Sequence, residues 1–429
     1  MRTPRRGSAF LPYLVVPLAL ALLVACSSAP KQPTEVEQAK KLLDQAWGMG
    51  GNGQVLVVSL LYDYPDLPFA REKVGEAVKS PSLSLKVEGA RVLARWADPG
   101  TKDLLRDLLR DDSDVVRLIA ARTLARLGDD SGREILAGAI RDADGALEPD
   151  VCAALHAIGD DACLAPATRD LVAKDDAKSA AAAAVLGEIG TEQARQALRR
   201  KLMNLYKERR NPALLALAQI GNPQDVAAVV PFANYRDNLL TVIEALGTFG
   251  GDAAIGHLRH WLTQKKDPVV RVAAACALVQ AGVVDDDVVA ALEEGAASDR
   301  REVRAKVARG LRGSTADGKV TAVLARLCGD PEPSIRRDAL LALEGRTDAS
   351  VLPALRTAWE KGKQSNQEGP EYESALLALR LAARIPGEEA MGLLREGLAS
   401  QNWAHNIEAA LGILWREKQG MLGGGQEAS

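Results

Sequence analysis

The strongest constraint on the fold is a repeat of 31 residues that runs through the middle of the chain. A leucine recurs at this spacing, followed three residues later by an aliphatic residue and four residues later by a glycine. Columns that stay in phase over four units indicate an array of repeats, because periods of 20–50 residues are typical of solenoids. The leucines are Leu124, Leu155, Leu186 and Leu217, and the glycines are Gly128, Gly159, Gly190 and Gly221.

The leucine column extends back by 31 residues to Leu93 and continues forward with looser spacing from Leu246 to Leu411. Each unit contains two helical patterns, such as TKDLLRDLLRD followed by DVVRLIAARTLARLG, and the second pattern is rich in alanine. Neither helix could bury its apolar face alone, so the units must stack. We therefore predict an all-α fold over residues 81–417, an α-solenoid of about ten to eleven stacked two-helix repeats.

Several second helices share a branched apolar residue followed by arginine. The segments VVRLIAARTLARLG, VVRVAAACALVQAG, EVRAKVARGL and SIRRDALLAL resemble the second helix of HEAT repeats. The nearest type is the short HEAT-like repeat of phycobilisome lyases. The resemblance implies a superhelix of helix pairs, and it is specific for fold while carrying little information on function. The residue pairs are Val116-Arg117, Val270-Arg271, Val303-Arg304 and Ile335-Arg336.

Residues 1–25 are predicted to be a lipoprotein signal peptide. Three arginines precede an apolar run whose length is typical of a signal sequence. The run ends in LVAC, which resembles the lipobox of bacterial lipoproteins and implies diacylglycerol on the Cys26 thiol, with cleavage before it. An uncleaved anchor helix is the alternative. The resemblance further implies an exported protein of the cell envelope, and Ser27 in place of Asp favours the outer membrane.

The remaining boundaries follow from changes in pattern. Residues 26–33 form a short tether that spans at most roughly 28 Å, which keeps the folded body close to the membrane. Residues 34–80 are predicted to be an atypical N-terminal helical cap, and residues 418–429 a flexible tail rich in glycine.

The sequence offers little that indicates catalysis. His257 and His260 could share a helix face, but no third metal ligand is evident. The stretch GMGGNG over 48–53 fits G-x-G-x-x-G, yet it follows a charged helical pattern rather than a strand. We predict no catalytic residue, no metal and no cofactor.

The cysteines after Cys26 are expected to be small core residues. A Cys152–Cys163 disulfide is the alternative for an exported chain. The pair brackets the turn at Gly159 unevenly, which predicts poor geometry for such a bond.

Four arginines are the candidate partner-binding residues. Positions two before and two after the leucine column lie four residues apart, hence on one helix face. In HEAT-like folds the second helix commonly lines the concave side, so the resemblance implies a basic patch inside the curve. Arginine binds carboxylate and phosphate bidentately, which favours an acidic protein segment or anionic lipid headgroups; ordinary solvated arginines are the alternative. The four are Arg91, Arg95, Arg122 and Arg126.

The sequence favours a non-enzymatic scaffold for protein–protein interaction, anchored by lipid and binding through the concave solenoid face. An enzyme or accessory subunit of bilin-lyase-like type and an envelope structural protein are the alternatives. A net charge of −3 gives no electrostatic footprint for nucleic acid. Aromatic residues make up only 4% of the chain, which argues against an aromatic-lined pocket and against glycan stacking. The expected partners are an unidentified, acidic protein and the membrane.

Overall fold

The computed structural model describes residues 34–204, 210–264, 266–314, 317–365 and 369–422. The predicted signal peptide, the tether and Cys26 lie outside these ranges. Helices α2 to α25 fill the described part of the chain, which contains no strand beyond the isolated bridge between Arg141 and Leu147. None of the helices searched there is long and apolar enough to cross a bilayer. The predicted all-α class is confirmed.

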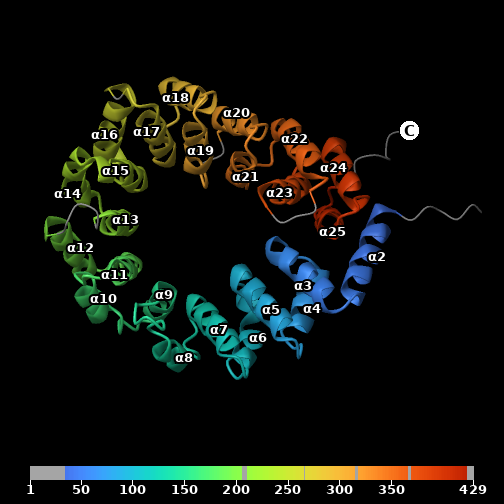
Figure 1. Ribbon diagram of the computed structural model, residues 1–429. Helices are drawn as coiled ribbons and strands as arrows, with labels where there is room; N and C mark the ends of the chain where they lie inside the picture. Colours follow the sequence, from blue (N-terminus) through green and yellow to red (C-terminus); the bar gives the residue numbers. More distant parts are fainter. Residues whose placement is uncertain (1–33, 205–209, 265, 315–316, 366–368, 423–429) are drawn as a thin grey trace, which may run out of the picture.

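The helices form pairs in two layers that curve into a ring (Figure 1). The outer layer contains α2 (Glu35–Gly48), α4 (Pro68–Ala77), α6 (Lys102–Leu108), α8 (Arg133–Gly138), α10 (Leu164–Asp170), α12 (Glu192–Asn204), α14 (Val226–Val229), α16 (Gly251–Gln264), α18 (Asp286–Ala296), α20 (Gly318–Leu327), α22 (Leu352–Gly362) and α24 (Glu388–Leu398). The inner layer contains α3 (Gly51–Leu60), α5 (Leu83–Trp96), α7 (Asp114–Arg126), α9 (Pro149–Ala157), α11 (Asp176–Ile189), α13 (Asn211–Ile220), α15 (Arg236–Phe249), α17 (Pro268–Gln280), α19 (Arg301–Gly310), α21 (Pro333–Ala342), α23 (Pro370–Arg384) and α25 (Trp403–Lys418). The predicted solenoid of stacked helix pairs is confirmed.

Capping residues mark the turn between one repeat and the next at the same place in each in-phase unit. The glycine that follows each inner helix has a positive φ of 63–74° over the four in-phase units, a conformation that favours glycine and ends the helix. The next residue accepts a hydrogen bond of 2.9–3.3 Å from a backbone N–H two or three residues on, which begins the next outer helix. The cap residues are Asp129, Asp160, Thr191 and Asn222, and Asp98 acts in the same way after Ala97, whose φ is 46°.

The branched-residue and arginine pairs stabilise the turn between the two helices of a unit. The apolar member is buried, and the arginine folds back to donate to the carbonyl oxygen six residues upstream. These bonds tie the start of the inner helix to the end of the outer one, so the motif is structural. They are Arg117 to Asp111 at 2.6 Å, Arg304 to Ser298 at 3.0 Å, and Arg336 to Asp330 at 2.8 Å.

The expectation of poor geometry for a Cys152–Cys163 disulfide is wrong. The two cysteines are bonded, with Cα atoms 5.7 Å apart, and both are buried. The turn after α9 brings Cys163, which directly precedes α10, back to Cys152 in the first half of α9 despite its uneven placement. Cys276 and Cys328 are free and buried, and burial raises the pKa of each thiol to about 12. These two are core residues, as predicted.

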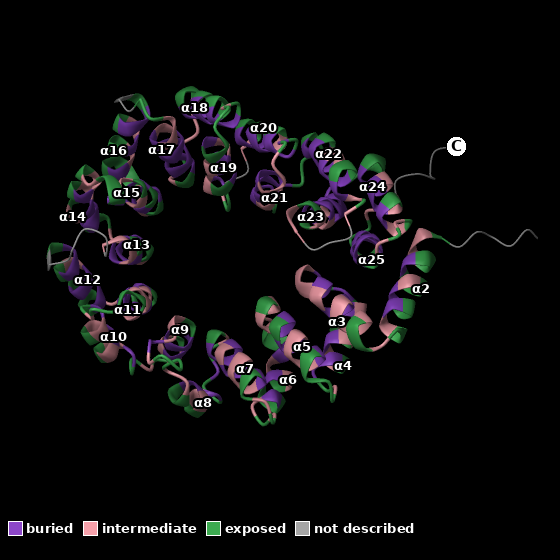
Figure 2. Ribbon diagram, in the orientation of Figure 1, coloured by how far each residue is buried: buried purple, intermediate pink, exposed green. Residues whose placement is uncertain are grey.

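The ends of the solenoid meet, which the sequence did not indicate. Helix α2 packs against α25, and α3 also contacts α25, so the helices at residues 34–80 join the last repeat (Figure 1). As a result α25 is covered on several sides and is mostly buried (Figure 2). The ring is thus closed within a single chain.

A cluster of polar residues lies at this junction, and we call it the closure cluster. Arg380 bonds Asp63 at 2.7 Å and Glu408 at 3.0 and 3.1 Å, while the Tyr64 hydroxyl donates to Glu408 at 2.7 Å. Arg384 donates to the Asp63 carbonyl oxygen at 2.5 Å. Burial, with the charge of Glu408, raises the pKa of Tyr64, so this hydroxyl stays protonated as a donor. The cluster joins residues more than 300 positions apart.

Replacing Glu408 should open the ring. Glu408→Ala leaves Arg380 and Tyr64 without their buried acceptor, and breaking such a pair costs about 3–5 kcal/mol. We expect a larger radius of gyration in small-angle scattering and a lower midpoint of thermal unfolding, with helicity retained. Glu417→Ala on the same helix removes only an exposed pair with Lys40 at 3.6 Å and should change neither quantity. Equal behaviour of the two variants would contradict the role of the cluster.

Asp129 should make stability depend on pH. The Ser131 hydroxyl and amide and the Arg106 guanidinium hold the pKa of this buried carboxyl at about 2, below the ordinary 3.8. The stabilisation is therefore present above about pH 4 and is lost as pH falls from about 4 to 2. Asp129→Asn should cost about 2 kcal/mol at pH 7, and its deficit in urea unfolding should shrink over that window. Asp130→Asn, at an exposed neighbour, is the control; a deficit independent of pH would refute the assignment.

Candidate functional site

The four arginines singled out from the sequence lie on α5 and α7, in the inner layer. An inner helix is covered by its outer partner and by its two inner neighbours, so an exposed side chain in its middle faces the inside of the ring. Arg91 on α5 fits this description, with 58% of its side chain exposed. Arg95 and Arg126 lie one turn further along the same face and are also exposed.

Three of these arginines have carboxylate partners. Arg91 is 3.4 Å from Glu88 on its own helix, Arg122 pairs with Asp150 on the next inner helix, and Arg95 is 3.8 Å from Asp63. Arg126 has no carboxylate partner within the described residues. Burial, with the nearby charge of Arg126, lowers the pKa of Arg122.

Ring closure adds two arginines that the sequence analysis missed. Asp63, the partner of Arg95, also bonds Arg380 of α23, and its carbonyl oxygen accepts from Arg384. Arg384 stacks on Trp415, 3.9 Å from the ring centroid, which fixes its position. No local signal in the sequence relates these residues, because they meet only when the two ends of the chain join. We call the six residues the basic arc: Arg91, Arg95, Arg122, Arg126, Arg380 and Arg384.

Small residues follow the basic arc along the inner face. The positions equivalent to the arginines are Ala153 and Ala157 on α9, and Ala184 and Glu188 on α11. Glu188 accepts a hydrogen bond of 2.7 Å from Gln219 of α13, one repeat further on. The inner face therefore changes from basic to small and weakly acidic over four repeats.

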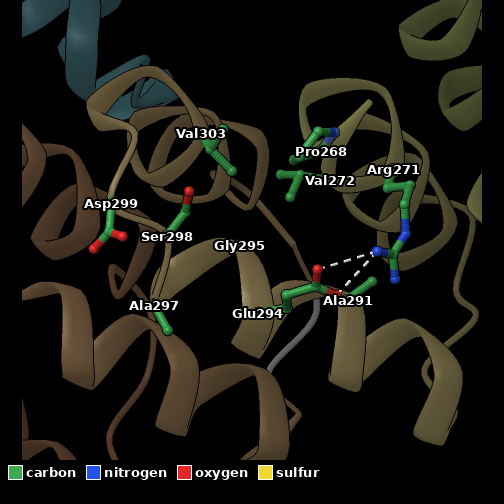
Figure 3. Close-up of a pocket in the computed structure, with 10 residues that line it drawn as sticks. All are labelled: Pro268, Arg271, Val272, Ala291, Glu294, Gly295, Ala297, Ser298, Asp299 and Val303. Carbon is green, nitrogen blue, oxygen red and sulfur yellow. Dashed lines mark hydrogen bonds and ion pairs between the residues drawn. The ribbon is translucent and has the colours of Figure 1, made fainter. Parts of the chain in front are cut away.

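Two hollows interrupt the surface near α17. The rim hollow, of about 370 Å³, lies where α17 and α19 begin and α18 ends, and the ion pair of Arg271 with Glu294 crosses its side (Figure 3). The inner hollow, of about 300 Å³, is lined by residues of α15, α17 and α19, together with Arg312 just after α19. All of these belong to the inner layer, so the inner hollow faces the inside of the ring.

The histidine pair considered from the sequence lies elsewhere. His257 and His260 are exposed on the outer helix α16, and His257 lies beside Trp261, with the ring centroids 6.3 Å apart. Within the described ranges no three residues of the types His, Cys, Asp and Glu are grouped so that they could hold a metal ion.

A family model for HEAT repeats matches residues 72–155, 233–312 and 289–367, which together cover more than half of the chain. The chain belongs to the HEAT-repeat family. The matches include Val-Arg pairs whose arginines donate to the preceding turn, so the family pattern and the observed bonds describe the same structural unit. No protein of curated function matches the sequence significantly.

Solved structures with similarity to this HEAT-repeat chain include three that span most of it. An engineered protein is 19% identical over 81% of this chain and 98% of its own, with a TM-score of 0.29. Human deoxyhypusine hydroxylase in complex with glycerol is 14% identical over 81% and 96%, with a TM-score of 0.23. The complex of CpcE and CpcF of phycocyanin lyase from Nostoc sp. PCC7120 is 19% identical over 82% and 96%, with a TM-score of 0.22.

Proposed function

We propose that this HEAT-repeat protein is a lipid-anchored, non-enzymatic scaffold of the bacterial cell envelope that captures an acidic polypeptide segment on the inner face of its ring. The observation that carries the proposal is the basic arc. A chain with a net charge of −3 places six arginines on the inner helices α5, α7 and α23, and Asp63 links those of α5 and α23. Such a concentration of one sign of charge attracts a partner of the opposite sign.

The internal carboxylates neutralise the basic arc only in part. Asp63 is shared by Arg95 and Arg380, Glu408 is used inside the closure cluster, and Arg126 has no carboxylate in the described part of the chain. Guanidinium groups left with free N–H donors can bind further carboxylates bidentately. An acidic side chain on a partner would therefore find donors already arranged on α5 and α7.

The neighbouring inner face suits a polypeptide. The alanines of α9 and α11 leave room for an extended main chain beside the arginines. Leu215 of α13 and Leu240 of α15 are 40% and 37% exposed on inner helices, where they could contact apolar side chains of a partner. An acidic segment with some aliphatic residues is the partner that this surface fits best.

Placement in the envelope rests on the lipobox-like sequence before Cys26 and is supported by the disulfide between Cys152 and Cys163. Disulfides persist in oxidising compartments outside the cytoplasm. An accessory role in a lyase-like reaction and a purely structural role in the envelope stay as sequence-based alternatives.

Charge reversal in the basic arc should weaken capture of acidic segments. Arg91 and Arg126 are the suitable pair, because both are exposed and neither takes part in the closure cluster. Arg91→Glu with Arg126→Glu should weaken binding of a labelled hexaglutamate peptide about tenfold or more, because charge-assisted bonds are lost. The loss and its salt dependence are measured by fluorescence anisotropy at two ionic strengths.

The matched control is Arg200→Glu with Arg326→Glu, at exposed positions on the outer helices α12 and α20. Arg106 and Arg141 are unsuitable, because they bond Asp129 and Asp170 and stabilise the stack. If the outer pair weakens peptide binding as much as the inner pair, the basic arc is not the binding surface.

Lipidation of Cys26 is tested in the native bacterium or an enteric host. The wild-type chain should partition into detergent, with its mass raised by acyl chains and residues 1–25 removed. Cys26→Ala should remain unprocessed and unlipidated. Recovery of the wild-type protein from a periplasmic extract without lipid would refute the anchor.

A further inference from the structure

The inner hollow contains charges that the protein leaves without partners. Lys306 on α19 and Arg312 just after it form one side, and Glu244 of α15 lies on the other. None of these three side chains takes part in an ion pair or a hydrogen bond within the described residues. Arg309, between the two cations in sequence, is held by Asp338 of α21 through a bond of 3.0 Å.

The rim hollow provides a contrast. Its cation and its carboxylate, Arg271 and Glu294, pair with each other at 3.0 Å across its edge (Figure 3). Its charges are therefore satisfied without a ligand. In the inner hollow, cations and carboxylate face the same space from different helices and remain separate.

The floor between the charged sides consists of small residues. Ala273, Cys276 and Ala277 of α17 and Gly310 of α19 line it. A Cβ atom placed on Gly310 would lie only 2.7 Å from the Cys276 sulfur, so glycine is needed for α17 and α19 to pack this closely. The close packing keeps the hollow at about 300 Å³, near the lower end of the range for small-molecule sites.

We propose that the inner hollow binds a small amphoteric group, one that carries a carboxylate and an ammonium. The carboxylate binds between Lys306 and Arg312, and the ammonium lies beside Glu244. Glu244 would repel a simple anion, and Lys306 and Arg312 would repel a simple cation. Only a ligand with both charges can pair with the cations and with the carboxylate at the same time. The ligand class is that of amino acids and of short peptides with adjacent acidic and basic groups.

This site is separate from the basic arc. The basic arc lies on α5, α7 and α23, whereas the inner hollow lies on α15, α17 and α19 (Figure 1). The two proposals can therefore fail independently. A variant of the inner hollow that retains hexaglutamate binding would keep the proposed function while testing this site alone.

Isothermal titration calorimetry on the mature chain tests the inner hollow with three probes. The dipeptide lysyl-glutamate is amphoteric, succinate carries only carboxylates, and cadaverine carries only ammonium groups. We expect the dipeptide to bind most tightly. Lys306→Gln with Arg312→Gln should weaken its binding about tenfold or more, because charge-assisted bonds are lost.

Glu244→Gln gives the decisive comparison. The variant should weaken binding of lysyl-glutamate, because the ammonium loses its carboxylate partner. It should strengthen binding of succinate, because the carboxylate that repels this anion is gone. A second dipeptide with both ends blocked shows whether the ligand is a free molecule or part of a polypeptide chain. If the blocked form binds as well as the free form, the side chains of a polypeptide supply both charges.

The control is Arg200→Gln with Arg326→Gln on the outer layer, and circular dichroism checks that every variant keeps its helicity. The proposal is overturned if succinate binds wild type as tightly as lysyl-glutamate. It is also overturned if Glu244→Gln affects both probes alike, or if the outer control weakens the dipeptide as strongly as the inner variant does.

Discussion

The contact of Arg380 with Asp63 and Glu408 holds the two ends of the solenoid together and so closes it into a ring. A solenoid has only neighbour-to-neighbour contacts, and its two ends are ordinarily free. Here a half-buried arginine of α23 bonds an aspartate just before Tyr64 and a buried glutamate of α25, and Tyr64 shares the same glutamate. Glu408 comes from the neighbouring helix α25, whereas Asp63 reaches the guanidinium, and Tyr64 reaches Glu408, only when the two ends meet. Closure thus makes the last helix a buried one and the inner face a continuous surface.

The repeated part of the fold could be predicted from the sequence because its determinants are local. Each of the four in-phase repeats has a glycine with positive φ beside a capping residue, and several repeats have an arginine that donates to the carbonyl oxygen six residues back. Both features recur periodically in the sequence. Closure could not be predicted in this way. Asp63 and Arg380 occur once each, outside the periodic columns, and their relation depends on the curvature summed over all repeats.

The residues of the candidate site also fall into those that the sequence pattern predicts and those that only the folded chain brings together. Arg91 and Arg122 were found from periodicity and helix geometry, and the structure places both on inner helices. Arg380 and Arg384 join them only through closure, so a basic stripe of two repeats becomes an arc that crosses the junction of the chain ends. The inner hollow is a third case. Glu244 and Lys306 are ordinary charged residues in sequence, and only the packing of α15, α17 and α19 makes them face one space.

Closure is tested most directly by a distance measured across the junction. Lys40→Cys and Glu417→Cys place spin labels on α2 and α25, where the native side chains lie 3.6 Å apart. The two free thiols in the described ranges, Cys276 and Cys328, are buried. Pulsed electron spectroscopy on the mature chain should give one short, narrow distance distribution. Glu408→Ala should broaden and lengthen it. A broad distribution of long distances in the otherwise unaltered protein would show an open solenoid and would contradict the account.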